Sequence, residues 1–186
     1  MKIPVNYGGI DMEDRVILVD IFDNQIGSGE KMRVHREGRL HRAFSVFLYD
    51  GRKMLIQQRN PEKYHSGGLW ANACCSHPRD RETLEEAVDR RMSEELGIQP
   101  EVREIDSFVY RAVYGDGLSE YEYDHVFLGK YRGEVQANPD EISEVRWVEL
   151  DELSRDLQMH PEKYCAWFLI AAPKVIKKIQ EEWEDK

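Results

Sequence analysis

The sequence predicts an α/β or α+β fold, a sandwich in which mixed and antiparallel β-sheets are flanked by helices. β-Branched runs separated by turn signals are typical of antiparallel strands, and apolar residues that recur every four positions are typical of an amphipathic helix. Both patterns occur along 186 residues, 41% of them hydrophobic, without a linker or repeat. We therefore expect one globular domain over residues 1–186, in which residues 1–30 form an N-terminal strand or cap region.

Six segments are predicted to be strands. They cover residues 15–22, 43–49, 53–58, 107–113, 120–128 and 145–148. Asp23-Asn24 ends the first segment with a turn signal, and Asp50-Gly51 is a strong hairpin signal between the second and the third.

Two helices are predicted. The apolar stripe of the first consists of Leu84, Ala87, Val88, Met92 and Leu96. Thr83 and Glu86 have the spacing of a capping box, and Gly97 follows the last apolar residue as a helix-ending glycine does. The second helix covers residues 161–182, and Pro173 could interrupt it.

Composition excludes some partners. A formal net charge of -10 argues against non-specific binding to nucleic acid or to an anionic membrane surface. Cys74 and Cys75 are adjacent and Cys165 is the only other cysteine, a set that is awkward for disulfides and predicts a reducing compartment. The N-terminus lacks a signal-peptide pattern, and no run of about eighteen apolar residues occurs. We expect a cytoplasmic protein with no membrane partner.

Basic residues nevertheless gather in the middle third of this acidic chain. They are Arg59, Lys63, Arg79, Arg81, Arg90 and Arg91. Such a cluster suits a small polyanion, and the alternative is that these arginines are solvated partners of the many glutamates.

The segment from Trp70 to Ile98 carries most of the chemical information. It resembles the Nudix box, Gly-x5-Glu-x7-Arg-Glu-U-x-Glu-Glu-x-Gly-U with U aliphatic, whose helix presents carboxylates to divalent metals on a diphosphate. The positions that fit are Glu82, Arg90, Met92, Glu94, Glu95, Gly97 and Ile98. Ser76 replaces the template glycine, and Arg91 replaces the glutamate that helps to activate water in hydrolases. The fold signal is kept, whereas the hydrolytic signal is damaged.

Two further motifs narrow the resemblance. Asn72 to Pro78 form an Asn-x-x-Cys-x-His-Pro run, and Glu120 and Glu122 form a Glu-x-Glu pair. With these marks the chain, from about residue 31 to residue 167, resembles type I isopentenyl diphosphate:dimethylallyl diphosphate isomerase. The resemblance implies a Nudix-like fold and a small diphosphate as substrate. We expect a monomer or a homodimer.

Glu120 and Glu122 are candidate metal ligands. They lie two apart in a predicted strand, so both carboxylates face one side, although exposed glutamates at this spacing are also common without a metal. Together with three upstream histidines they would make a nitrogen and oxygen shell suited to Mn, Mg, Zn or Co.

The resemblance implies that shell as His35, His41, His77, Glu120 and Glu122. The register of His35 is inferred from the neighbouring Glu30-Lys31 pattern. The remaining histidines, His65, His125 and His160, are interpreted as structural or exposed.

The resemblance implies a second ion, Mg²⁺, that bridges the diphosphate to Glu95 and to the backbone oxygen of Cys75. It also implies cations for the diphosphate at Lys31, Arg59, Lys63 and Arg91. Charge-assisted bonds to phosphate are about twice as strong as neutral ones. For Arg91 the alternative is a helix salt bridge to Glu95 four residues on, and both readings can hold.

Moving the double bond of isopentenyl diphosphate needs an acid, a base and exclusion of water from a tertiary carbocation. The resemblance assigns the acid and base to Cys75 and Glu122, a proton-path hydrogen bond to Tyr110, and the ring face towards the cation to Trp167. Both aromatic residues could instead be ordinary core residues. The motif spacing selects Cys75 for the chemical role and leaves Cys74 for packing.

Two other classes of function are alternatives to the isomerase. A Nudix hydrolase of a nucleoside or prenyl diphosphate would be favoured by glutamate at position 91 and glycine at position 76. A non-catalytic binding domain would leave the spacing of the cysteine, histidine and glutamates without a reason.

Overall fold

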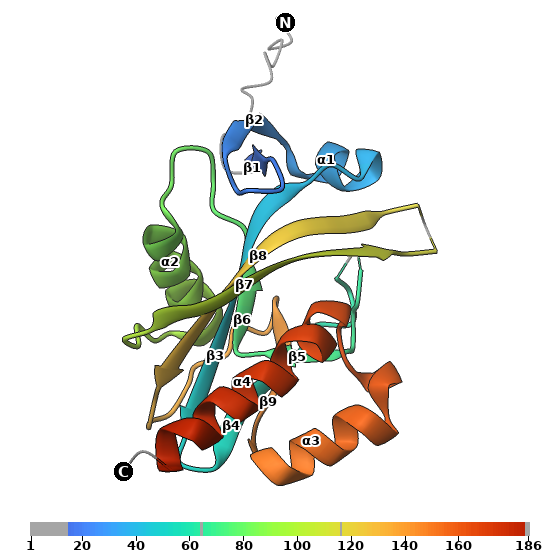
Figure 1. Ribbon diagram of the computed structural model, residues 1–186. Coiled ribbons are helices and arrows are strands. Elements are labelled where there is room, and N and C mark those ends of the chain that lie inside the picture. The colour runs from blue at the N-terminus through green and yellow to red at the C-terminus, as the bar shows by residue number, and fades with distance from the viewer. Residues whose placement is uncertain (1–14, 64, 116, 185–186) are drawn as a thin grey trace, which may run out of the picture.

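The computed structural model of the protein describes residues 15–63, 65–115 and 117–184 (Figure 1). Within these residues, nine strands form one hydrogen-bonded network that is packed by helices, so the predicted α+β class is confirmed. The strands are β1 (Arg15–Val19), β2 (Gln25–Glu30), β3 (His41–Asp50), β4 (Lys53–Arg59), β5 (Trp70–Asn72), β6 (Cys74–Ser76), β7 (Arg103–Val113), β8 (Ser119–Lys130) and β9 (Ile142–Glu149). The helices are α1 (Lys31–Glu37), α2 (Leu84–Leu96), α3 (Leu150–Met159) and α4 (Ala166–Glu184), with a 3-10 turn at Pro161–Lys163.

Strand β3 is central to the arrangement. It pairs in parallel with β8 and antiparallel with β4 and β6, so the network is mixed. The register places His41 level with Glu122 and Ser45 level with Cys75. Residues far apart in the sequence are thereby brought together by backbone pairing alone.

The two faces of the sheet carry different hydrophobic clusters, because side chains alternate along a strand. Phe44, Val46 and Leu48 of β3 pack with the apolar stripe of α2, whereas Phe47 and Tyr49 pack with α3 and α4. Figure 1 shows α2 on one side of the sheet and α3 and α4 on the other. His41 and Ser45 alternate with Phe44 and Val46 along β3, so they lie on the second face.

Helix α2 is capped as predicted. The Thr83 hydroxyl accepts from the Glu86 amide at 3.2 Å, the Glu86 carboxylate accepts from the Thr83 amide at 2.9 Å, and Gly97 adopts a left-handed conformation with φ 67°. Helix α1 was not predicted. It begins where the Glu30 carboxylate accepts from two amides of its first turn and ends at Gly38, whose φ is 60°.

Some predicted boundaries were wrong. The first strand ends at Val19 rather than at residue 22, because the Asp20 carboxylate accepts from the amides of Phe22 and Asn24 and closes a turn. It pairs with β2 as a hairpin, and the part of the predicted cap region before residue 15 lies outside the described residues.

The C-terminal helix also differs from its prediction. It begins at Ala166 rather than at residue 161, because Tyr164 is extended and pairs with Trp70. It continues through Pro173, where packing of its apolar side against the sheet compensates for the lost hydrogen bond. No helix in the described part of the chain is long and apolar enough to cross a membrane.

Candidate active site

A cavity lies where β3, β6 and β8 approach α2. Its lining consists of Lys31, Phe44, Ser45, Gln57, Arg59, Lys63, His65, Cys75, Ser76, His77, Arg91, Glu95, Tyr110, Glu120, Glu122, Glu141 and Trp167. This set contains every site residue predicted from the sequence except His35 and His41. Those two are fully buried, with ring centroids 5.4 Å and 4.9 Å from that of His77.

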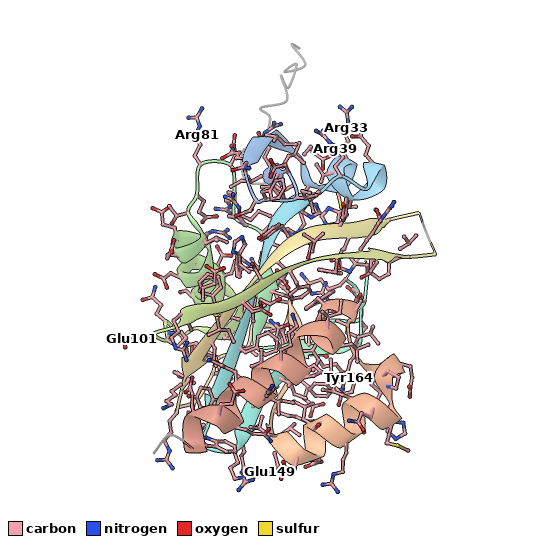
Figure 2. All side chains as sticks on the ribbon, viewed as in Figure 1. Arg33, Arg39, Arg81, Glu101, Glu149 and Tyr164 are labelled. Carbon is pink, nitrogen blue, oxygen red and sulfur yellow. The ribbon has the colours of Figure 1, made fainter. Side chains whose placement is uncertain are left out.

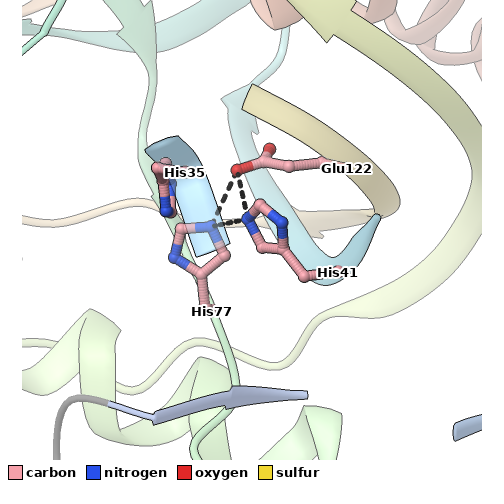
Figure 3. Close-up of side chains that lie close together, drawn as sticks. All are labelled: His35, His41, His77 and Glu122. Carbon is pink, nitrogen blue, oxygen red and sulfur yellow. Dashed lines mark hydrogen bonds and ion pairs between the residues drawn. The ribbon is translucent and has the colours of Figure 1, made fainter. Parts of the chain in front are cut away.

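Three histidines and one glutamate converge beside this cavity (Figure 3). Nε2 of His77 lies 2.7 Å from Oε1 of Glu122, and Nε2 of His41 lies 3.5 Å from the same oxygen. The two Nε2 atoms are 3.2 Å apart. One ligand atom each from His35, His41, His77 and Glu122 lies within 4.8 Å of the others, which is the geometry of a group able to hold a metal ion.

The protonation of these imidazoles suits a divalent cation. Nδ1 of His35 lies 2.7 Å from the Lys31 carbonyl and Nδ1 of His41 lies 2.8 Å from the Arg39 carbonyl. A carbonyl only accepts, so each Nδ1 carries the proton and each Nε2 presents a lone pair. Burial, and for His35 the neighbouring His41, lowers the pKa of His35, and burial lowers that of His77 well below its ordinary value. Neutral imidazoles are the form that binds metal.

Glu122 is ionised in this setting. Burial alone would raise its pKa, but the interactions with His77 and His41 lower it well below the ordinary value.

Glu120 points to a different partner. Its Oε1 lies 2.8 Å from Nε2 of His65, and its Oε2 lies 3.1 Å from the Tyr114 hydroxyl. A second group able to hold a metal therefore consists of His35, His65 and Glu120, so the five ligands expected from the sequence are divided between two groups that share His35.

His65, interpreted from the sequence as structural or exposed, is buried in the cavity wall, with Nε2 2.8 Å from Oε1 of Glu120. No motif spacing marks it, and only its closeness to Lys63 in the chain could have drawn attention to it. His125 is buried between Asp23 and Glu104, and His160 is exposed at the surface, which confirms the interpretation for both.

Tyr110 joins the two carboxylates. Its hydroxyl lies 2.6 Å from Oε2 of Glu122 and 2.8 Å from Oε2 of Glu120. Burial, followed by the charges of these two glutamates, raises the pKa of Tyr110 well above its ordinary value, so the phenol keeps its proton and donates it. Tyr110 thus lines the cavity as well as packing in the hydrophobic core.

Cys75 and Cys74 differ in position. Cys75 is half-buried and lines the cavity, whereas Cys74 is fully buried in the hydrophobic cluster under α2. Burial raises the pKa of the Cys75 thiol well above its ordinary value, although the Arg59 guanidinium, 3.7 Å from the sulfur, opposes that shift. The thiol is therefore neutral and holds a proton inside the cavity.

Asn72 explains why an asparagine begins the cysteine motif. Its amide donates to the carbonyls of Val46 and Cys74, and its Oδ1 accepts from Nε1 of Trp167 at 3.0 Å. One side chain thus fixes the strand that carries the cysteines and orients the indole. The guanidinium carbon of Arg59 lies over that indole, 5.4 Å from the ring centroid.

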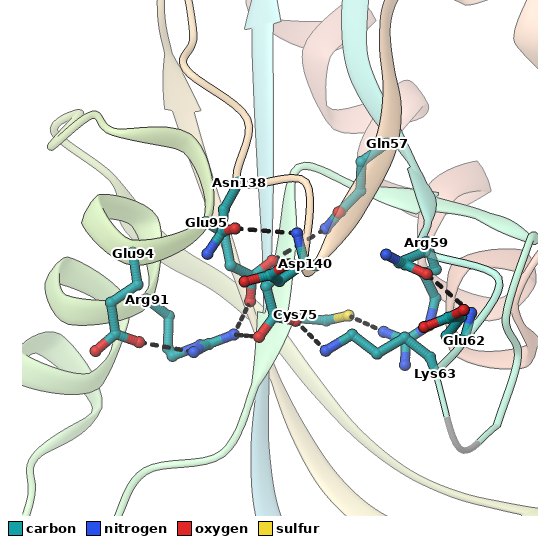
Figure 4. Close-up of polar contacts among 12 residues, drawn as sticks. Gln57, Arg59, Glu62, Lys63, Cys75, Arg91, Glu94, Glu95, Asn138 and Asp140 are labelled. Atoms are coloured by element: carbon teal, nitrogen blue, oxygen red, sulfur yellow. Dashed lines mark hydrogen bonds and ion pairs between the residues drawn. The ribbon is translucent and has the colours of Figure 1, made fainter.

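Helix α2 contributes Arg91 and two carboxylates (Figure 4). Arg91 donates to Glu95 at 2.5 Å and to Glu94 at 2.6 Å, so the helix salt bridge that was the alternative prediction for Arg91 is present. Glu95 is buried and also accepts from Nε2 of Gln57 at 3.4 Å. Arg91 therefore faces the cavity while its partners hold it in place.

Glu141 was not identified from the sequence. It precedes β9, forms an ion pair with Lys63, and lies 3.3 Å from the Arg91 guanidinium. Burial would raise its pKa, but Lys63 and then Arg91 lower it, so it is ionised. Burial and the charges of Arg91 and Lys63 lower the pKa of the nearby Lys31, as expected in a cluster of cations.

The other arginines of the basic cluster differ in their position relative to the cavity. Arg79 and Arg90 line a second cavity, with Arg15, that shares Lys31, Lys63 and Arg91 with the first. Arg90 is held by Glu82 through two bonds of 2.6 Å and 2.8 Å. Arg81 is exposed and extends away from the body of the protein (Figure 2).

Fold and sequence place the chain among the Nudix-domain proteins. The NUDIX domain family matches residues 39–168. Among solved structures, DR0079 of Deinococcus radiodurans is similar with a TM-score of 0.72 at 21% identity, over 86% of this chain and 98% of that one. At this identity the likeness concerns the fold alone.

Curated relatives define the family more narrowly. Isopentenyl-diphosphate Delta-isomerase 2 of Aromatoleum aromaticum is 48% identical over 89% of this chain and 88% of its own length. Isopentenyl-diphosphate Delta-isomerase 2 of Photorhabdus laumondii is 43% identical over 93% of this chain and 98% of its own. The chain belongs to the isopentenyl-diphosphate Delta-isomerase family.

Proposed function

We propose that this protein interconverts isopentenyl diphosphate and dimethylallyl diphosphate by protonation and deprotonation of carbon, as the names of its relatives imply. The observation that supports this best is that a neutral thiol, Cys75, and a buried carboxylate, Glu122, line one cavity. An alkene is a very poor base, so its protonation needs a positioned acid and a site from which water is excluded.

Cys75 and Glu122 act as the acid and base pair. One delivers a proton to the terminal carbon of the alkene, the other removes a proton two carbons away, and in the reverse direction each takes the opposite part. Tyr110 holds the Glu122 carboxylate in place through its hydroxyl. Trp167, buried against Asn72, presents its ring to the carbocation, an interaction worth about 2 kcal/mol or more when desolvated.

Divalent ions belong to this proposal. The imidazoles of His35, His41 and His77 with the carboxylate of Glu122 fit one ion, Mn²⁺, Mg²⁺ or Zn²⁺, because their donor atoms already converge. We assign Glu120 to the edge of the same site and Glu95, with the Cys75 backbone oxygen, to a diphosphate-bound Mg²⁺. When bound, these ions supply positive charge that orients carboxylates and neutralises phosphate.

Four cations would hold the diphosphate, and all line the cavity. They are Lys31, Arg59, Lys63 and Arg91. The same proposal includes one catalytic domain for the whole chain, a cytoplasmic location, and a monomer or homodimer that binds no nucleic acid.

A hydrolase is the second candidate, because the chain has a Nudix domain and Glu95 on the box helix. Arg91 argues against it, since it replaces the carboxylate that activates water with a cation that faces the cavity.

Phosphorus and proton NMR of the protein with isopentenyl diphosphate and Mg²⁺ in deuterated water tests the proposal. We expect dimethylallyl diphosphate with deuterium in its methyl groups and no released phosphate, and no conversion by Cys75→Ala. Released phosphate with an unchanged hydrocarbon would favour the hydrolase instead.

A further inference from the structure

We propose that Glu141 makes this cavity selective for a metal-complexed diphosphate over a free one. The proposal rests on the proposed function, because it assumes that the cations of the cavity bind diphosphate. Glu141 would act on the phosphate cations Lys63 and Arg91, as a residue that determines specificity and not as a catalytic residue.

The position of Glu141 is fixed by its backbone. Its carbonyl accepts from the Asn60 amide at 2.9 Å, and its amide donates to the Asn138 carbonyl at 3.0 Å. The next residue, Ile142, is level with Arg59 in the β4–β9 pairing. The carboxylate is therefore delivered to the cavity at a defined place beside the basic residues of β4 and the turn that follows.

The carboxylate bridges two cations that the diphosphate would use. One oxygen is ion-paired with Lys63, and the other lies 3.3 Å from the Arg91 guanidinium. Only 23% of the Glu141 side chain is exposed, so water screens this contact poorly. Arg91 is also contacted by Glu95 at 2.5 Å, which means that two cavity-lining carboxylates neutralise one guanidinium.

This arrangement opposes a free diphosphate. The anion must compete with Glu141 for Lys63 and Arg91, and its charge would then lie close to both Glu141 and Glu95. A divalent ion on the diphosphate reverses the sign of these contacts, because carboxylates attract it. The same carboxylates that repel the free anion therefore favour its metal complex.

Glu141→Gln tests the inference, because it keeps the size of the side chain and removes its charge. The probe is inorganic diphosphate, and its dissociation constant is measured by calorimetry in excess chelator and again in saturating Mg²⁺. We define the metal dependence as the ratio of the dissociation constant in chelator to that in Mg²⁺. We expect the variant to bind the metal-free anion about tenfold more tightly than the unchanged protein and to bind the anion in Mg²⁺ with little change in affinity. The metal dependence should therefore fall about tenfold.

Glu94→Gln is a matched control. Glu94 contacts the same guanidinium at 2.6 Å but is 41% exposed and does not line the cavity. We expect its metal dependence to stay within about twofold of that of the unchanged protein, because solvent screens its charge. Glu141→Asp, which withdraws the carboxylate by one methylene, should shift the metal dependence in the same direction as Glu141→Gln and by less.

Three results would overturn the inference. The first is an unchanged metal dependence in both Glu141 variants. The second is an equal loss of affinity with and without Mg²⁺ in these variants, which would mean that Glu141 only supports the structure. The third is a shift of the same size in Glu94→Gln, which would indicate a general charge effect. The isomerisation assay on the same preparations separates this inference from the proposed function, since the diphosphate measurement requires no turnover.

Discussion

Replacement of Tyr110 by phenylalanine removes one hydroxyl and leaves the buried ring. That hydroxyl is 2.6 Å from Glu122 and 2.8 Å from Glu120, and no more than 6% of the residue is exposed, so water cannot easily replace it. A hydrogen bond to a charged group contributes about 1.5–3 kcal/mol. Because about 1.4 kcal/mol corresponds to a factor of ten in rate, we expect kcat to fall about 10- to 150-fold.

The assay is steady-state isomerisation, with KM measured in parallel. KM should change little, since no contact between Tyr110 and the basic residues of the cavity occurs among the described interactions. Tyr114→Phe is the control, because the Tyr114 hydroxyl donates to Glu120 at 3.1 Å, accepts from Ser66, and has no described contact with Glu122. Tyr114 is also less buried than Tyr110. An equal loss in both variants, or an unchanged kcat in Tyr110→Phe, would refute the assignment of Tyr110 to the positioning of Glu122.

Cys75→Ala should abolish turnover while Cys74→Ala keeps most of it, and equal activity in the two variants would contradict the choice between these cysteines. Arg79 lines the second cavity, where its charge would attract the anionic substrate, so Arg79→Ala should lower kcat/KM about threefold at low salt and weaken the salt dependence of kcat/KM. An identical effect of Arg81→Ala would argue against electrostatic attraction through the second cavity. Glu82→Gln should lower the free energy of unfolding near neutral pH by about 1.5–3 kcal/mol, since it breaks the two hydrogen bonds from the Arg90 guanidinium to the Glu82 carboxylate. Burial would raise the pKa of Glu82, but the bonds from Arg90 and from the Arg79 amide hold it below its ordinary value of 4.5 in the folded state. The stabilisation is therefore full above pH 4.5 and is lost as the pH falls through the folded-state pKa. Denaturant unfolding that shows the same difference between the two proteins well below pH 4.5 would contradict this reasoning.

Local sequence signals predicted the parts of the fold that local chemistry decides. The capping box at Thr83, the stop at Gly97 and the hairpin at Asp50-Gly51 each depend on neighbours in the chain. Helix α1 was missed because it is short and its N-terminal cap is a glutamate, Glu30, which is an unusual capping residue. The late start of α4 follows from a long-range pairing of Tyr164 that no local pattern contains.

In the candidate site, too, the residues within local motifs could be predicted, whereas those brought in by long-range folding could not. Residues inside recognisable motifs, such as Cys75, His77 and Glu122, were named from the sequence and line the cavity. His65 and Glu141 lie in connecting segments without a motif, and only the folding of these segments against β8 and α2 brings them to the cavity.

The convergence of donors around Glu122 has a consequence for the lifetime of the protein. Its partners come from α1, β3 and the residue after β6, so the unfolded chain has no such group. An ion bound there would stabilise the folded state by about 1.4 kcal/mol for every tenfold excess of its concentration over the dissociation constant. Metal supply would then govern how long a molecule survives heat and proteases, and a starved cell would lose the enzyme itself as well as its turnover.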